Sequence, residues 1–253
     1  MRILIFHGYL LRGTGSNIYN ANLSRALAKL GHEVHLLCQD RTADAPEGVT
    51  IHVPDIGRVL PVYVADHYDG FDALPFPKLD EAALNHYLNA NIVAVRSVPS
   101  PDIALANHLV MGPVILARAL EGRVPYAVKV HGSALEYTVR PHPERFLPYA
   151  LEGISGASGV LVGSRHTAES LWEVVSQDRS LPERTRLGPP GVDVDSFRPR
   201  TTEEAIIGLN RLTDKLQTET ASWGGETGAA EALRNLAKIH QDLAKEHAVK
   251  AIK

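Results

Sequence analysis

The chain has 253 residues, of which 44% are hydrophobic and 22% are charged, a composition typical of a globular protein with a sizeable core. A net charge of −3 and a pI of about 6.5 exclude a strong overall attraction to nucleic acid or to an anionic membrane. The single cysteine, Cys38, excludes an internal disulfide, and no apolar run is long enough for a signal-peptide core or an integral membrane segment, so we expect a cytoplasmic protein.

The first residues predict a strand, a glycine-bearing loop and a helix. Residues 2–7 form a short apolar run typical of a buried strand, and apolar residues then recur at helical spacing from Ile18 to the stop at Gly31. Residues 33–38 predict a second strand, which completes a βαβ unit. The loop is aimed at the helix N-terminus, where free N–H groups and the helix dipole favour a phosphate. The sequence therefore predicts a phosphorylated ligand.

The loop departs from the dinucleotide-binding motif. Residues 13–18 read Gly-Thr-Gly-Ser-Asn-Ile, so the third glycine of G-x-G-x-x-G is missing, and several residues separate them from the strand end. Asp40 stands about where a ribose-binding acid would lie, but we favour the interpretation that it begins a solvated loop. An NAD enzyme is therefore the weaker alternative.

The following residues alternate between short apolar runs and helical patterns. We expect strands at residues 49–53, 62–65, 103–106, 126–130 and 159–163, and helices at residues 79–98, 110–120, 144–155 and, capped by Ser164, as far as Val175. This alternation predicts an α/β fold with a doubly wound, mostly parallel, Rossmann-like sheet that binds ligands at the carboxyl ends of its strands.

Polar residues gather where four of these strands end. The four endings are His7-Gly8, Asn107-His108, His131-Gly132-Ser133 and Ser164-Arg165. One histidine at a strand end would more simply have a structural role. Four polar endings at one edge of one sheet favour a shared cleft, because open α/β sheets bind ligands there.

Four motifs occur in an order that resembles a known family. They are Gly13-Thr14-Gly15-Ser16-Asn17, His131-Gly132-Ser133, Val162-Gly163-Ser164-Arg165, and the segment from Pro190 to Pro199. Together they resemble the N-terminal domain of a retaining glycosyltransferase of family 4, which has the two-domain GT-B fold, and the resemblance covers roughly residues 1 to 200. Many relatives carry asparagine where Pro190 stands, so an asparagine-mediated hinge contact is not expected.

The resemblance implies transfer of a sugar from a nucleotide-sugar donor to an acceptor hydroxyl, with retention at the anomeric carbon and with neither metal nor cofactor. In that family the glycine loop lies against the donor diphosphate, and a histidine faces the transferred sugar, which makes His131 the catalytic candidate. Glycines let the backbone approach an anionic diphosphate, and a leaving phosphate needs donors fixed in advance. The diphosphate candidates are Gly13, Thr14, Gly15, Ser16 and Arg165. For Arg165, a surface ion pair is an equal alternative. The cleft or acceptor candidates are His7, Asn17, His108, Ser133 and Ser164.

The resemblance also implies a second domain that grips the nucleotide. The interdomain-like segment ends near Pro199, which leaves too few residues for another domain of about 150 residues. We therefore expect an acceptor-side domain at residues 1–200, a helical linker or insertion at residues 201–253, and a second GT-B domain or partner chain elsewhere. Without it, this chain alone is expected to be inactive. The E-x7-E spacings at Glu136, Glu144 and Glu152 lie within the first domain and are interpreted as coincidental.

Residues 201–253 have a helical pattern of their own. Residues 201–204 offer a capping box, and apolar residues follow at near-helical spacing as far as Leu216. Gly224-Gly225 breaks the pattern, and a second amphipathic helix is expected at residues 229–248. The two helices are predicted to form a hairpin, because the glycine pair allows the second to fold back.

Other chemistry finds little support in the sequence. There is no zinc-binding histidine or cysteine spacing, no G-x-S-x-G motif and no G-x-x-x-x-G-K-[ST] phosphate loop. The arginines at residues 179–200 are interleaved with acids, so a nucleic-acid site is not expected. Two alternatives to a transferase remain: a non-catalytic module that binds a nucleotide or sugar, and, more weakly, an NAD-dependent sugar-modifying enzyme.

Overall fold

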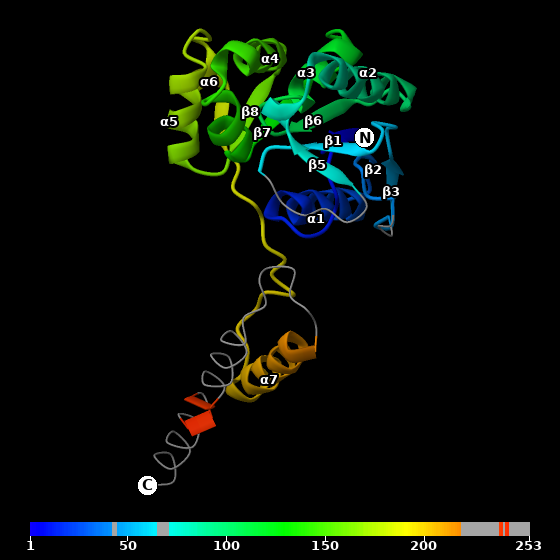
Figure 1. Ribbon diagram of the computed structural model, residues 1–253. Helices are drawn as coiled ribbons and strands as arrows, with labels where there is room; N and C mark the ends of the chain where they lie inside the picture. Colours follow the sequence, from blue (N-terminus) through cyan, green and yellow to red (C-terminus); the bar gives the residue numbers. More distant parts are fainter. Residues whose placement is uncertain (42–44, 65–70, 219–237, 240, 243–253) are drawn as a thin grey trace. The chain divides into compact units, whose positions relative to one another are not determined.

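The computed structural model describes residues 1–41, 45–64, 71–218, 238–239 and 241–242 (Figure 1). The chain divides into two compact units, Met1–Pro190 and Gly191–Lys253. The first unit is an α/β domain, and the described part of the second is dominated by one helix.

The first unit is built on a parallel sheet of seven strands in the order β3-β2-β1-β6-β7-β8-β9. Its strands are β1 (Arg2–Phe6), β2 (Glu33–Leu37), β3 (Val49–His52), β6 (Ile103–Asn107), β7 (Tyr126–Val130), β8 (Gly159–Val162) and β9 (Thr185–Leu187). From β1 the chain first builds outward to β3, and it then returns to place β6 on the other side of β1, with Ile3 opposite Ile103. The order therefore reverses between β1 and β6, which is where open α/β sheets bind ligands.

Helices cover both faces of this sheet, which is why its central strands are continuous apolar runs. They are α1 (Gly15–Lys29), α2 (Glu81–Ser97), α3 (Gly112–Leu120), α4 (Pro143–Ser155), α5 (Arg165–Val174) and the short α6 (Leu181–Arg184). Figure 1 shows α1 below the sheet and α2, α3 and α4 above it. A small core joins α1 to Ile3 and Ile5, whereas the larger core joins the helices of the other face to Leu4 and Phe6. Alternate residues of β1 thus supply both cores.

Helices α3 and α4 pack so closely that a glycine is required between them. A Cβ atom added to Gly153 of α4 would lie 2.5 Å from the Cβ of Pro113 and 2.7 Å from the backbone nitrogen of Val114. Real Cβ atoms do not approach other heavy atoms this closely, so a side chain at residue 153 would force the two helices apart.

The predicted doubly wound α/β fold is confirmed, but some short elements differ. The prediction of a strand at residues 62–65 is wrong. The observed strand is β4 (Val59–Val62), which pairs with β5 (Asp72–Pro75) in a separate two-stranded sheet. Neither short strand shows a clear alternation of apolar and polar residues, and each contains a proline. The sequence also missed the 3-10 turn Phe76–Lys78, the π-helical turn Leu135–Val139, α6 and β9.

The second unit contains α7 (Thr202–Thr218), which begins at the predicted capping box. The backbone N–H of Thr201 donates to Oε2 of Glu204 over 3.0 Å, and the N–H of Glu204 donates to Oγ1 of Thr201 over 3.2 Å. This reciprocal pair satisfies two N–H groups at the start of the helix. The second helix and the hairpin predicted for residues 229–248 fall outside the described residues, except for four of them.

Candidate active site

The predicted strand-end residues meet at the reversal of strand order. His7 follows β1, Asn107 ends the neighbouring β6, and His131 follows β7 on the far side of β6. Because all three strands are parallel, their carboxyl ends share one edge, next to the loop that leads into α1. This edge holds the cluster described below.

A chain of hydrogen bonds begins at His7, whose side chain is buried. Its Nδ1 lies 3.0 Å from Nδ2 of Asn20, and its Nε2 lies 2.9 Å from Oδ1 of Asn17 and 3.0 Å from the carbonyl oxygen of Leu10. Since an amide nitrogen can only donate, Nδ1 of His7 accepts, and the ring proton sits on Nε2. His7 therefore supports the loop and α1 from beneath rather than lining an open cleft.

Asn107 extends this chain to His131. Its Nδ2 donates to Oδ1 of Asn20 over 2.7 Å and to the carbonyl oxygen of Phe6 over 3.1 Å, and its Oδ1 accepts from Nε2 of His131 over 2.8 Å. Asn107, Asn20 and His7 thus each accept a hydrogen bond on one side and donate on the other, whereas His131 only donates. The arrangement places the proton of His131 on Nε2 and leaves a lone pair on Nδ1. No hydrogen bond from another described residue reaches that Nδ1.

Both histidines at the ends of this chain are uncharged at neutral pH. Burial lowers the pKa of His7 from 6.5 to about 4. Burial also lowers the pKa of His131 to about 3, with smaller contributions from the positive charge of Lys129 and from His7. Neutral His131 therefore offers Nδ1 as a hydrogen-bond acceptor to a ligand hydroxyl.

These pKa values make the folded state sensitive to mild acid. The unfolded chain takes up protons on both histidines as the pH falls below 6.5, whereas the folded chain resists until about pH 4 for His7 and about pH 3 for His131. We expect the free energy of unfolding to fall by about 1.4 kcal/mol per pH unit for each group below pH 6.5. Urea unfolding between pH 7.5 and pH 5 measures this slope. A folded-state NMR titration of His7 near pH 6.5 would contradict the prediction.

His108 occupies an unusual place beside this chain. It is 3% exposed and adopts a positive φ of 67°, and its ring lies 4.5 Å from that of Tyr63, 5.0 Å from that of His131 and 5.5 Å from that of Tyr9, centroid to centroid. Neither ring nitrogen has a hydrogen-bond partner among the described residues. Burial holds the pKa of His108 well below 6.5. His108 thus keeps unused hydrogen-bonding capacity inside an aromatic cluster.

The glycine loop leads directly into α1. Gly13 has a φ of +87°, which favours glycine, and the N-cap Thr14 makes no side-chain hydrogen bond to the helix. The first turn of α1 carries no acidic residue, so its free N–H groups and its dipole are not neutralised there. The loop is held by the N–H of Leu11, which donates to Oδ2 of Asp40 over 3.1 Å, and by Nδ2 of Asn17, which donates to the carbonyl oxygen of Arg12 over 2.6 Å.

Asp40 belongs to this loop support. The interpretation of Asp40 as the start of a solvated loop is wrong, because it is 3% exposed. Besides accepting from Leu11, its carboxylate lies 3.9 Å from the guanidinium of Arg12. The Asp40 carboxylate therefore binds the loop and is not placed to bind a ribose.

The remaining predicted site residues lie outside the hydrogen-bonded chain. Arg165 begins α5 with 87% of its side chain exposed and pairs with Glu169 over 2.8 Å, as in the surface-pair alternative. Ser164 caps α5 by accepting from the N–H of Thr167 over 3.1 Å. Ser133 is half-buried after Gly132, and Oγ of Ser16 lies 3.4 Å from Oγ1 of Thr14. Glu136 and Glu152 form ion pairs with Arg140 and Arg118, which fits a coincidental spacing.

Several residues of the cluster were not predicted from the sequence. Asn20 lies one helical turn after Asn17, a spacing that could have revealed it, and Tyr19 contacts His131 at 5.2 Å between ring centroids. Tyr9, Tyr63 and Lys129 gave no such signal, because aromatic residues in loops and a lone lysine in an apolar strand fit many roles.

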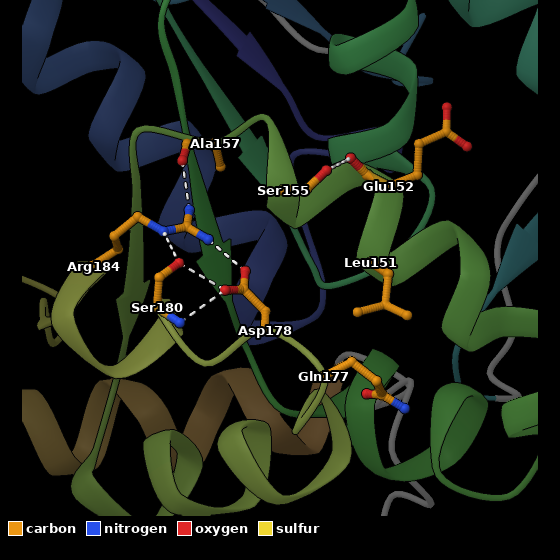
Figure 2. A pocket seen from close by; sticks show the side chains of 8 residues that line it. All are labelled: Leu151, Glu152, Ser155, Ala157, Gln177, Asp178, Ser180 and Arg184. Atoms are coloured by element: carbon orange, nitrogen blue, oxygen red, sulfur yellow. Dashed lines mark hydrogen bonds and ion pairs between the residues drawn. The ribbon is translucent and has the colours of Figure 1, made fainter.

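A shallow pocket lies at the other edge of the sheet (Figure 2). Ser155 and Ala157 precede β8, so they mark the amino end of that strand, opposite His131. Arg184 donates to the carbonyl oxygens of Ala157 over 2.6 Å and Ile154 over 3.2 Å and pairs with Asp178 over 2.5 Å. Its guanidinium is occupied in holding the end of α4, which indicates a structural role for this pocket.

The described parts of the chain hold neither a membrane-spanning helix nor a cluster of metal ligands. None of the helices described there is long and apolar enough to cross a membrane. Likewise, no group of three or more histidine, cysteine, aspartate or glutamate side chains within the described residues is placed to hold a metal ion.

Sequence comparison adds independent information about the chain. The sequence model of Glycosyltransferase Family 4 matches residues 13–196. A D-inositol 3-phosphate glycosyltransferase from Frankia alni is 27% identical over 216 residues, which are 80% of this chain and 50% of the relative. An enzyme of the same name from Xylanimonas cellulosilytica is 28% identical over 197 residues, 76% of this chain and 45% of the relative. The chain therefore spans about half the length of the curated relatives that it matches.

Structural comparison agrees on the fold. Sucrose-phosphate synthase from Thermosynechococcus elongatus superposes with a TM-score of 0.53 at 15% identity, over 95% of this chain and 68% of that one. The N-terminal domain of trehalose-6-phosphate phosphatase from Candida albicans gives 0.51 at 17% identity, over 84% of this chain and 54% of that one. These likenesses concern the Rossmann-like fold alone.

Proposed function

Because the chain belongs to Glycosyltransferase Family 4, we propose that it transfers a sugar from a nucleotide-sugar donor to an acceptor hydroxyl, with retention at the anomeric carbon and without a metal. The observation that carries this proposal is the chain of hydrogen bonds from Leu10 to His131 at the reversal of strand order. It fixes one imidazole, neutral and with a free acceptor nitrogen, beside the glycine loop.

In this proposal the glycine loop receives the donor diphosphate. Gly13 and Gly15 leave room for close approach of phosphate oxygens, with nothing within 4 Å of either missing side chain. Thr14, Ser16 and the first N–H groups of α1 donate to those oxygens, and the helix dipole favours their charge. Arg165 has its ion pair with Glu169, so it contributes only if that pair opens.

His131 orients the transferred sugar. Its Nε2 proton is committed to Asn107, so Nδ1 accepts a hydrogen bond from a sugar hydroxyl. A hydrogen bond fixed before the reaction costs no reorganisation when the glycosidic bond to phosphate breaks. Asn107 and His7 act through His131 and the loop, as positioning residues.

The aromatic cluster around His108 is the proposed acceptor subsite, and it must open to bind, because both ring nitrogens of His108 are buried. Its rings are uncharged, and His108 can donate one hydrogen bond and accept another. A polyol presents hydroxyl groups that both donate and accept. The names of the curated relatives make D-inositol 3-phosphate the first acceptor to test.

The test is a transfer assay with the full-length protein, meaning this chain together with the second GT-B domain proposed for it, a panel of nucleotide sugars and polyol acceptors, and product analysis by NMR. We expect a product of retained anomeric configuration, unchanged rate with EDTA, and negligible transfer by residues 1–253 alone. An inverted product would contradict the retaining mechanism. A non-catalytic binding module is the alternative, and it predicts nucleotide binding with no product at all. The loop contacts of Asp40 count against the NAD-dependent alternative.

Replacing His108 with phenylalanine separates its ligand role from a structural one. The His108→Phe variant keeps a ring in the cluster but removes two buried nitrogens that lack partners. We expect the free energy of unfolding to rise by about 1 kcal/mol, since such nitrogens destabilise the fold. The acceptor KM should rise roughly tenfold, because the ligand hydroxyl loses its partner. Loss of stability with an unchanged acceptor KM would contradict the acceptor role.

A further inference from the structure

Lys129 is a buried charge that the proposed reaction leaves unused. It lies on β7, two residues before His131, and only 1% of it is exposed. Tyr126, Val128 and Val130 of the same strand face the large core, so Lys129 points to the opposite side of the sheet, toward α1. Lysine is rarely buried so fully without a carboxylate partner.

The contacts of its ammonium group are few. Nζ donates a hydrogen bond to the carbonyl oxygen of Gly188, which follows β9. Nζ also lies 5.5 Å from the ring centroid of Tyr19, which in turn contacts the His131 ring. No carboxylate within the described residues forms an ion pair with it. Burial accordingly lowers the pKa of Lys129 from its ordinary value of 10.5.

This arrangement is unfavourable for the fold and suited to an anion. A desolvated ammonium with one carbonyl partner destabilises the folded state unless a negative charge compensates it. Its positive charge acts on His131, and its ammonium lies over Tyr19 of α1, the helix that the glycine loop enters. In surroundings that exclude water, a fixed positive charge is screened only weakly.

We propose that Lys129 is a positioning residue of the transfer reaction: its buried ammonium, held by Gly188 and Tyr19, supplies a fixed positive charge beneath His131 and the glycine loop that favours the diphosphate of the donor and of the leaving nucleotide. The inference rests on the proposed function, because it requires an anion at this edge. It adds a residue that acts through its charge without touching the ligand.

Two neutral variants separate the charge from the hydrogen bond. Lys129→Met removes both, whereas Lys129→Gln keeps a donor for the carbonyl of Gly188 and removes only the charge. Lys29→Met is the matched control, because it removes the same charge from the exposed last turn of α1, at the end opposite the glycine loop. Each variant is made in the full-length protein, and UDP and GDP are the probes.

We expect both Lys129 variants to bind whichever of UDP and GDP the unmodified protein prefers about tenfold more weakly in calorimetry. Their Tm should be equal to or higher than that of the unmodified protein, and Lys29→Met should bind normally. An NMR titration gives a second readout. The other groups facing His131 are Asn107, Tyr19 and the neutral rings of His7 and His108, so removing Lys129 should raise the pKa of His131.

Three outcomes would overturn the role of Lys129. They are normal binding by Lys129→Met, normal binding by Lys129→Gln, and an unchanged pKa of His131 in both variants. A loss of binding that accompanies a large drop in Tm would likewise indicate a structural lysine. An unmodified protein that binds neither nucleotide and transfers no sugar would instead contradict the proposed function.

Discussion

The His131→Ala variant is expected to lose at least roughly 100-fold in the rate of sugar transfer while remaining folded. The substitution removes the imidazole whose free Nδ1 is proposed to accept a hydrogen bond from the transferred sugar. Removing one preorganised hydrogen-bonding group from an active site costs about 100-fold to 1000-fold in kcat. Stability should change little, because the losses are one hydrogen bond to Asn107, at about 1 kcal/mol, and the ring contacts with Tyr19 and His108. Steady-state kinetics and thermal unfolding of the full-length protein measure both effects.

His166→Ala provides the control for His131→Ala. His166 is exposed near the start of α5 and forms none of the hydrogen bonds of the cluster, so its loss should alter neither rate nor Tm. If His131→Ala instead lowers the Tm strongly while each folded molecule keeps its normal activity, His131 has a structural role and the catalytic assignment is wrong.

The Gly153→Ala variant is expected to have the largest effect on stability. The new Cβ would lie 2.5 Å from Pro113 and 2.7 Å from the backbone of Val114, so α3 and α4 must separate. Overpacking of this kind costs about 1–3 kcal/mol and occasionally more, and here backbone atoms of α3 cannot turn away as a flexible side chain would. We expect a loss at the upper end of that range. Urea unfolding of residues 1–253 gives the value.

The matched control is Gly163→Ala in the same domain. A Cβ on Gly163 meets no atom within 4 Å, so this variant should unfold within about 0.5 kcal/mol of the unmodified protein. Equal stability of the two variants would mean that α3 and α4 absorb an added methyl group without strain, contrary to the tight packing described above.

The central strands could be predicted because both faces of the sheet are covered. Residues 3–6 and 126–130 are apolar at nearly every position, a pattern that indicates burial on both sides. The alternation of these strands with helices then predicted the parallel sheet and its binding edge. The strands β4 and β5 escaped prediction because each has four residues and a proline, and each is stabilised by pairing with the other rather than by its own pattern.

The candidate site was predictable in place but not in detail. The endings at His7, Asn107 and His131 could be assigned to one edge because parallel strands end together. The sequence could not show that Asn20 lies between His7 and Asn107, since this depends on how α1 crosses the sheet. Lys129 was equally hidden, because a lysine within a strand is usually interpreted as solvent-facing.

The uniform direction of the hydrogen bonds between Leu10 and His131 restricts how these residues can diverge in evolution. Aspartate at Asn107 would set an acceptor against the oxygen of Asn20, and turning the Asn20 amide to donate would aim its oxygen at Nδ1 of His7. His7 would then need its other tautomer, which would bring a bare Nε2 against the carbonyl of Leu10. A backbone carbonyl cannot become a donor, so the direction of the hydrogen bonds cannot be reversed along the whole chain. Substitutions at these positions are therefore strongly epistatic, and lineages that change one of them must replace the set together.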